Sequence, residues 1–396
     1  MNIRNQSLTD HAGITSGSFD MVAKTFRGLE DVLAGEIEAI GGSKIRKGTR
    51  VVYFSGNKEL MYRANFHLRT ALRILIPFYE FLAKDENELY DRALEFDWSS
   101  LFRKNMTFAI DGVLNSPYFN HSRYISLKVK DAIADQFRKK TGKRPDVDTV
   151  NPDIRLNLHI SDDRCTLLLD SSGESLHKRG YRSEASPAPL NEVLAAGMIM
   201  LTGWDRRSDF IDPMCGSGTI PIEAAMMAYN IPPGIYRKNF AFEKWTDFDR
   251  PLLESIYNED YPDLPALPRI TGSDISSRSI SMARSNAKNA FLGKKIDFKI
   301  SSFENMVPPG NGGVLVMNPP YGGRLKHENM KAFHVIIGDC LKKNYAGYAA
   351  WILTSNLEAL KFTGLRPDRK ILLFNGPLEC RFVKYSIYKG SKKQNR

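Results

Sequence analysis

Cysteine is scarce in this sequence, and the few cysteines are not grouped. The chain of 396 residues has four of them, Cys165, Cys215, Cys340 and Cys380, with no CxxC motif and no Cys/His cluster. This spacing argues against a disulfide framework and against a zinc site, and it fits a reducing compartment. We therefore expect no metal cofactor and a cytoplasmic location.

Long hydrophobic runs are missing as well. The longest apolar stretches are much too short to cross a bilayer, so the sequence predicts no membrane segment. The opening residues MNIRNQSLTDHAGITSGSFD lack the apolar core of a secretory signal, and we interpret residues 1–20 as a polar lead-in. Internal repeats and low-complexity tracts are also lacking.

Acidic residues are outnumbered by basic ones. Asp and Glu total 45 against 56 Lys and Arg, which gives a net charge of +11 and favours a polyanionic partner such as RNA. The run KIRKGTR at 44–50 contains four basic residues and no acid. A second run supplies the candidate RNA-binding residues, which are Arg138, Lys139, Lys140, Lys143 and Arg144. A solvated face, or cations at a helix C-terminus, explains part of this pattern equally well.

The chain length and the periodicity of its apolar residues predict several domains. Residues 21–72 read as a small α/β subdomain, and 73–170 as a second α/β region with a long helix, a basic turn and a hairpin. The segment 171–189 is rich in Ser, Gly and Pro and is the best linker candidate, although it also contains His177, Lys178, Arg179 and Arg182 beside Tyr181.

Residues 190–390 alternate between strand and helix patterns, before a basic tail at 391–396. This alternation predicts a doubly wound, mostly parallel sheet with an antiparallel end. Ligands on such sheets bind at the carboxyl ends of the strands. The residues that follow each predicted strand are therefore the candidates for a ligand-binding site.

The segment DFIDPMCGSGTIPIEAAMMA reads as a strand, a glycine-rich turn and a helix. The dinucleotide fingerprint needs a third glycine where this chain has Pro221, and no GK[ST] of a P-loop is present. Gly216 and Gly218 allow the backbone to approach a ligand closely. Asp212, at the end of the strand, can bind the ammonium group of an amino-acid-like cofactor.

Asp274 ends the next predicted strand, in RITGSDIS. A carboxylate at this place can accept both hydroxyl groups of a ribose, or it can cap the helix that follows. It lies 62 residues after Asp212, whereas about 20 is usual. A Pro- and aromatic-rich insertion at 230–269 accounts for the excess and could cover the cofactor or touch the substrate, although surface packing suffices for most of it. Ser302 and Phe303 follow the third strand, where an adenine ring would lie.

The most specific motif is NPPY, which comprises Asn318, Pro319, Pro320 and Tyr321 at the end of the fourth predicted strand. The side-chain oxygen of Asn318 and the carbonyl of Pro319 can each accept a hydrogen bond from an exocyclic amine. The prolines hold this geometry at low entropic cost, and Tyr321 offers a ring on which a base can stack. The motif therefore predicts a site for a flat ring that carries an amino group.

Together these motifs resemble the class I S-adenosylmethionine-dependent methyltransferases that act on amino groups. The segments DPMCGSGTIPIEAA, GSDIS, NPPYGGRL, HKRGYR with APLNEVLAA, and ECRFVKY are most similar to those of the THUMP-domain RNA methyltransferases, in particular the RlmL type, which methylates guanine N2 in bacterial large-subunit ribosomal RNA. The resemblance spans nearly the whole chain. It implies a C-terminal Rossmann-like methyltransferase domain preceded by an α+β ferredoxin-like subdomain (21–72) and a THUMP domain (73–170) that bind RNA.

The resemblance also implies residue roles. The cofactor S-adenosylmethionine, with S-adenosylhomocysteine as product, would be bound by Asp212, Met214, Gly216, Gly218, Asp274, Ser302, Phe303 and Asn318. The catalytic residues would be Asn318, Pro319, Pro320 and Tyr321. Met214 stands where many methyltransferases have a further glycine, a substitution shared by the THUMP group. The larger relatives carry a second methyltransferase domain, and this chain ends after the first.

Other functions share parts of this pattern. A transfer-RNA guanine-N2 methyltransferase of the same family would carry the same motifs. NPPY also occurs in DNA adenine-N6 methyltransferases, but no separate DNA-recognition region follows the catalytic motifs here. Protein glutamine methyltransferases use NPPY with a helical partner domain, unlike residues 21–170. A non-catalytic RNA-binding module would not need intact cofactor motifs. The motifs do not determine the oligomeric state.

Overall fold

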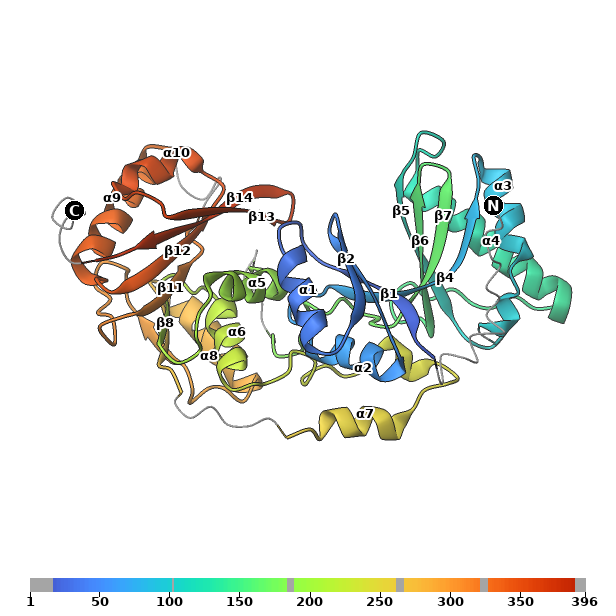
Figure 1. Cartoon of the computed structure of the whole chain (residues 1–396), viewed down its shortest axis with the longest axis horizontal. Helices are drawn as coiled ribbons and strands as arrows, with labels where there is room; N and C mark the ends of the chain where they lie inside the picture. Colours follow the sequence, from blue (N-terminus) through green and yellow to red (C-terminus); the bar gives the residue numbers. More distant parts are fainter. Residues whose placement is uncertain (1–16, 102, 184–188, 261–266, 321–326, 389–396) are drawn as a thin grey trace. The chain divides into compact units, whose positions relative to one another are not determined.

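Two β-sheets of seven strands each organise the regular structure (Figure 1). The computed structural model describes residues 17–101, 103–183, 189–260, 267–320 and 327–388. These residues divide into two units, the first from within 1–24, 34–176 and 238–259, and the second from within 25–33, 177–237 and 260–396. Each unit contains one sheet, so the two units are described one at a time.

The sheet of the first unit has the strand order β2-β3-β1-β4-β7-β6-β5. Its strands are β1 (Phe19–Lys24), β2 (Ser43–Gly48), β3 (Val51–Gly56), β4 (Arg73–Leu82), β5 (Phe108–Asn115), β6 (Ile154–Ser161) and β7 (Arg164–Asp170). The long strand β4 pairs antiparallel with β1 on one side and with β7 on the other. The strands expected for two α/β regions therefore form one continuous sheet.

The strand β2 was not predicted from the sequence. Its residues, SKIRKG, include a single apolar side chain, so no alternating pattern marks it. It lies at the edge of the sheet and pairs antiparallel with β3, and charged residues are common on edge strands because they discourage further pairing. The basic run at 44–50 is thus an edge strand and the turn after it.

The helices of the first unit that precede residue 142 confirm the predicted pattern. They are α1 (Glu30–Ala39), whose first residues belong to the second unit, α2 (Lys58–His67), α3 (Glu86–Glu95) and α4 (Ser122–Thr141), with a 3-10 turn, η2, at Trp98–Ser100. Helix α4 buries Ile125, Val129 and Phe137, and it ends at Gly142, which adopts a left-handed conformation. Helices α3 and α4 lie together on one face of the β5–β7 strands (Figure 1).

Part of the long insertion belongs to the core of the first unit. Residues 238–259 contain a 3-10 turn, η3 (Ala241–Lys244), and helix α7 (Arg250–Tyr257). The buried ring of Phe242 stacks on Tyr62 of α2 with centroids 4.1 Å apart, and the Asp249 N–H donates to the Tyr62 hydroxyl at 3.0 Å. This segment therefore packs into a core, and surface packing describes it poorly.

The sheet of the second unit has the order β10-β9-β8-β11-β12-β14-β13. Its strands are β8 (Asp209–Asp212), β9 (Ile270–Asp274), β10 (Asp297–Ile300), β11 (Gly313–Met317), β12 (Tyr348–Thr354), β13 (Arg369–Asn375) and β14 (Leu378–Ser386). The first five are parallel, whereas β14 pairs antiparallel with β12 and with β13, so the sheet has the antiparallel end that the sequence predicted. The helices are α5 (Glu192–Thr202), α6 (Thr219–Ala228), α8 (Ser277–Asn289), α9 (His327–Asn344) and α10 (Leu357–Leu360), followed by a 3-10 turn, η4 (Lys361–Thr363).

The strand order of the second unit places the predicted site. From β8 the chain first builds outward through β9 and β10, and it then returns to add β11 on the other side of β8. The carboxyl ends of β8 and β11 therefore flank the point where the direction of winding reverses, which is where open α/β sheets bind ligands. Below this edge, Ile211 and Leu315 pack against Ile337 of α9 in one hydrophobic core.

Candidate functional site

Asp212 is the last residue of β8, and it is buried almost completely, with 1% of its surface exposed. One carboxylate oxygen accepts the Met214 N–H at 3.1 Å. Burial raises the pKa of the Asp212 carboxyl well above its usual value, and the negative charge of Asp274 raises it further. Among the described residues no cation pairs with Asp212. A ligand with a positive charge would remove this cost.

Asp274, at the end of β9, connects the two neighbouring strand ends. Its Oδ1 accepts the Ser276 N–H at 2.8 Å, and its Oδ2 accepts the Gly216 N–H at 3.0 Å. The N-cap of α8 is Ser276, whose hydroxyl accepts from Ser279, so the helix-capping role considered for Asp274 is wrong. The carboxylate oxygens retain further lone pairs that can accept hydrogen bonds from a ligand.

The glycine-rich turn after β8 has the backbone that its glycines permit. Gly216 and Gly218 have φ values of 53° and 85°, which side-chain-bearing residues seldom adopt. A Cβ on Gly218 would also lie only 3.0 Å from the Cβ of Ala283 in α8. The turn is closed by a hydrogen bond of 2.8 Å from the Gly218 N–H to the Cys215 carbonyl. Its backbone can therefore approach a ligand without an intervening side chain.

Asn318 follows β11 directly and presents an unpaired acceptor. The residue is half-buried, and its side-chain oxygen is buried yet has no hydrogen-bond partner among the described residues. A buried acceptor left unsatisfied costs about 1–3 kcal/mol, and a ligand N–H or a water that donates to it would remove this cost. Pro319 is buried and Pro320 is half-buried, whereas Tyr321 lies outside the described residues.

The other expected cofactor residues lie partly in the core. Phe303 is 4% exposed and stacks on Tyr345 with centroids 5.4 Å apart, and Met214 packs against the same hydrophobic cluster. Ser302 is half-buried just beyond the end of β10. The ring of Phe303 is therefore largely occupied by core packing, and Ser302 is the more accessible of the two.

The sheet thus brings together, along one edge, two carboxylates, a close-approach glycine turn and an unpaired amide oxygen. This donor set suits a ligand that carries a positive charge and hydroxyl groups, next to a second ligand that donates an N–H. In the described part of the chain, no group of His, Cys, Asp or Glu side chains is arranged to hold a metal ion. In the same residues, no helix is both long enough and apolar enough to cross a membrane.

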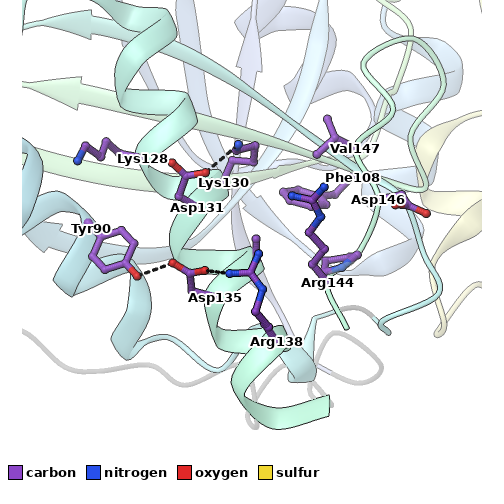
Figure 2. A pocket seen from close by; sticks show the side chains of 12 residues that line it. Tyr90, Phe108, Lys128, Lys130, Asp131, Asp135, Arg138, Arg144, Asp146 and Val147 are labelled. Carbon is purple, nitrogen blue, oxygen red and sulfur yellow. Dashed lines mark hydrogen bonds and ion pairs between the residues drawn. The ribbon is translucent and has the colours of Figure 1, made fainter. Parts of the chain in front are cut away.

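The predicted RNA-binding residues lie at the C-terminal end of α4 in the first unit and in the turn that follows. Arg138 and Arg144 line a cavity of about 670 Å³, together with Tyr90, Lys128 and Asp135 (Figure 2). Acidic partners that the run itself lacks come from elsewhere in the chain. Arg138 donates to Asp135 at 2.7 Å, and the Tyr90 hydroxyl donates to the same carboxylate at 2.9 Å (Figure 2).

The remaining cations of this run differ in their partners. Lys140 donates to Asp97 at 2.6 Å. Lys139, Lys143 and Arg144 are exposed and have no ion pair with any described residue. The spacing of Asp135 one helical turn before Arg138 could have revealed that pair, whereas nothing in the sequence pointed to Asp97.

The basic residues of the linker are not a surface cluster. Arg179 is 2% exposed, and its guanidinium donates to Glu223 of α6 at 3.3 Å, as does the buried Tyr181 hydroxyl at 3.3 Å. Arg182 donates to Glu192 of α5 at 2.7 Å. These side chains bind the segment to two helices of the second unit, which could not be predicted from the sequence because the acidic partners lie at distant positions.

Comparison with protein families matches three consecutive regions of the chain. Residues 20–75 match the RlmL ferredoxin-like domain, and residues 83–170 match the THUMP domain. Residues 179–384, more than half of the chain, match the RMKL-like methyltransferase domain.

Individual relatives agree with these matches. A ribosomal RNA large subunit methyltransferase K/L of Shewanella frigidimarina is 36% identical over 95% of this chain and 54% of its own length, so the chain spans about half of that relative. A Synechocystis protein, whose name assigns it provisionally as an RNA methyltransferase, is 36% identical over 96% of this chain and all of its own length. The crystal structure of SMU.472, provisionally a methyltransferase and complexed with SAH, has a TM-score of 0.84 at 29% identity and covers 94% of this chain and 99% of its own.

The buried charge of Asp212 leads to a prediction about stability. The carboxyl titrates near pH 4 in the unfolded chain and at higher pH in the folded one, so the ligand-free protein loses stability as the pH rises through that interval. We expect Asp212→Asn to melt about 2–4 °C higher than the parent at pH 8, which corresponds to about 1 kcal/mol, and to melt equally at pH 4. Thermal unfolding followed by circular dichroism measures both.

Asp205→Asn serves as the control, because hydrogen bonds from the Ser208 and Arg207 N–H groups lower the pKa of the exposed Asp205 carboxyl. That variant should melt at or below the parent temperature at pH 8. Equal melting of the parent and Asp212→Asn at pH 8 would show that the buried carboxylate carries no cost.

Proposed function

We propose that this chain, which belongs to the family of RMKL-like methyltransferases with THUMP and RlmL ferredoxin-like domains, methylates the exocyclic N2 amine of a guanine in large-subunit ribosomal RNA. The side-chain oxygen of Asn318 has no hydrogen-bond partner among the described residues and lies at the same sheet edge as two carboxylates and a glycine turn, and this arrangement carries the proposal. According to this proposal, residues 21–72 and 73–170 bind RNA, and residues 171–189 link them to the catalytic domain at 190–390. The reaction would take place in the cytoplasm.

The cofactor of class I methyltransferase domains is S-adenosylmethionine, which supplies an electrophilic methyl group on a sulfonium centre when bound. The buried charge of Asp212 supports a role in holding the cationic methionine end, next to Gly216 and Gly218. Asp274 would accept the ribose hydroxyls. Met214, Ser302 and Phe303 would complete the methionine and adenine sides, and Asn318 would face the reacting centre.

Asn318 and Pro319 would hold the target amine. Their two oxygens accept its two N–H groups, which turns the nitrogen lone pair away from the base and toward the methyl group. The amine reacts while neutral, so most of the acceleration comes from positioning. Pro320 keeps the turn rigid, and Tyr321 would supply the stacking surface for the flipped guanine.

The basic residues of the first unit would supply affinity for the RNA backbone. Lys139, Lys143 and Arg144 are the best placed, because no described carboxylate neutralises them. Arg138 and Lys140 would have to exchange Asp135 and Asp97 for phosphate. Backbone contacts of this kind are sensitive to salt and carry little sequence information.

The nucleoside that is methylated tests the proposal directly. Ribosomal and transfer RNA from cells with and without the gene are digested and compared by mass spectrometry, and purified full chain is then assayed on each RNA and on duplex DNA. We expect the loss of one N2-methylguanosine from large-subunit ribosomal RNA and its restoration in vitro. N2-methylguanosine restored only in transfer RNA would show that the substrate is transfer RNA, the first alternative. N6-methyladenine formed in DNA would refute the proposal in favour of the second alternative, a DNA adenine-N6 methyltransferase.

The role of Asn318 is separable from cofactor binding. We expect Asn318→Ala to lower turnover about 10²–10³-fold, because the amine loses one of its two acceptors. Binding of S-adenosylhomocysteine, measured by calorimetry, should change less than about threefold. Asn311→Ala is the matched control, since Asn311 is an exposed asparagine in the loop before β11. Near-normal turnover of Asn318→Ala would refute the assigned role.

The RNA contacts can be tested through salt dependence. Each phosphate contact contributes about 0.7–0.9 to the slope of log Kd against log salt concentration. We expect Lys143→Ala and Arg144→Ala each to weaken RNA binding and to lower this slope by roughly that amount. Arg92→Ala is the control, because Arg92 is an exposed arginine of α3 that pairs with Glu95 at 3.0 Å. Equal effects of all three variants would argue against a specific basic site.

A further inference from the structure

Arg182, in the segment before α5, forms a hydrogen-bonded contact with the glycine-rich turn. Its Nη1 donates to the Ser217 hydroxyl at 3.2 Å, and its Nη2 donates to the Thr219 hydroxyl at 3.0 Å. Ser217 lies between the two glycines of the turn, and Thr219 is the first residue of α6. Both are 4% exposed, so these contacts are shielded from solvent.

The turn needs hydrogen bonds from neighbouring side chains to hold its conformation, because glycine residues restrict the backbone less than any other residue. Ser217 is held from a second direction by Asn286 of α8, whose amide donates to the Ser217 carbonyl at 3.1 Å. The side-chain oxygen of Asn286 accepts the Ser183 N–H at 3.2 Å, so the residue next to Arg182 is tied to the same helix. Arg182 and Asn286 thus hold the turn at the Ser217 side chain and at the Ser217 backbone.

The charge of Arg182 is balanced where it lies. Glu192, the first residue of α5, is 7% exposed at its side chain and accepts from both Nε and Nη2 of Arg182, at 2.9 and 2.7 Å. An unpaired cation at the N-terminus of α6 would oppose the helix dipole. With Glu192 beside it, the guanidinium forms a neutral pair that acts through the fixed directions of its N–H groups.

We infer that Arg182 is a positioning residue for the methionine end of the cofactor. It acts through the Ser217 and Thr219 hydroxyls, which fix the turn that the methionine end approaches. The inference rests on the proposed function, since it takes S-adenosylmethionine as the ligand of this turn. The inference adds a residue from outside the catalytic motifs. It assigns a role in ligand binding to Arg182, the second arginine of HKRGYR.

Two ligands that share the adenosine end separate this role from a general loss of structure. S-adenosylhomocysteine has both the adenosine and the amino-acid end, whereas 5′-methylthioadenosine lacks the amino-acid end. We expect Arg182→Met in the full chain to weaken S-adenosylhomocysteine binding at least about tenfold, as the loss of charge-assisted hydrogen bonds predicts. Binding of 5′-methylthioadenosine should change less than about threefold, and so should kcat at saturating cofactor. Calorimetry and methyl-transfer kinetics measure these quantities.

Four further variants keep the test decisive. Arg182→Lys retains the charge but not the fork of N–H groups, so it should restore only part of the affinity. Ser217→Ala leaves the Arg182–Glu192 pair intact and should give the same selective loss, even if Arg182→Met folds poorly. In the double variant of Arg182→Met and Ser217→Ala the two losses should not add fully, because both substitutions remove the contact between Arg182 and Ser217. Arg278→Met is the control, since Arg278 is exposed in the first turn of α8.

The outcomes distinguish the inference from the function on which it rests. Equal weakening of both ligands by Arg182→Met and Ser217→Ala would mean a structural role alone and would overturn the inference. Unchanged affinity for S-adenosylhomocysteine in both variants would overturn it as well, with the proposed function intact. If the unaltered chain binds neither ligand, the proposed function fails, and the inference fails with it.

Discussion

The closeness of two carboxylates at neighbouring strand ends is the constraint on which the second unit depends. Asp212 is buried beside the negative charge of Asp274, and the folded chain offers them backbone N–H groups but no described cation. Such an arrangement costs stability in the absence of a ligand. A ligand that carries the missing positive charge would offset this cost, and the cofactor proposed above, with its sulfonium and ammonium groups, has that character.

The rest of the second unit serves to hold these strand ends in place. The reversal of winding between β8 and β11 brings Asn318 to the same edge as Asp212, although more than a hundred residues separate them. The glycine turn must be open to a ligand, so it cannot be filled by its own side chains, and neighbours hold it instead. Buried pairs of Arg179 with Glu223, and of Arg182 with Glu192, attach the preceding segment to α6 and α5.

The first unit differs from the second, because the charges of its candidate site that no described residue neutralises are basic and exposed, whereas those of the second are acidic and lie at the strand ends. Its basic run at the end of α4 is only partly neutralised, with Arg138 and Lys140 paired and Lys139, Lys143 and Arg144 without described acidic partners. Its core also includes residues 238–259, which come from within the catalytic half of the sequence. Because Phe242 and Tyr62 are buried together, this segment cannot leave without exposing part of that core. The chain therefore passes from one unit to the other several times.

The sequence by itself determined the element types, the parallel sheet with its antiparallel end, and the identity of the motifs at the strand ends. These follow from local patterns: the period of apolar residues, glycines before a helix, and prolines after a strand. It failed where the deciding partner is distant. The edge strand β2 forms because its backbone can pair with that of β3. Strand β4 joins the two predicted regions because it pairs with β1 along one edge and with β7 along the other.

Only the tertiary structure decided which charges are available. Arg179 and Arg182 read as part of a basic linker, yet Arg179 is buried against Glu223 and Arg182 is paired with Glu192, so neither charge is available to RNA. Asp274 read as either a helix cap or a ligand, and the cap is Ser276. That the Asn318 oxygen has no hydrogen-bond partner among the described residues was also invisible in the sequence, because whether an acceptor is satisfied depends on what the fold brings within hydrogen-bonding distance of it.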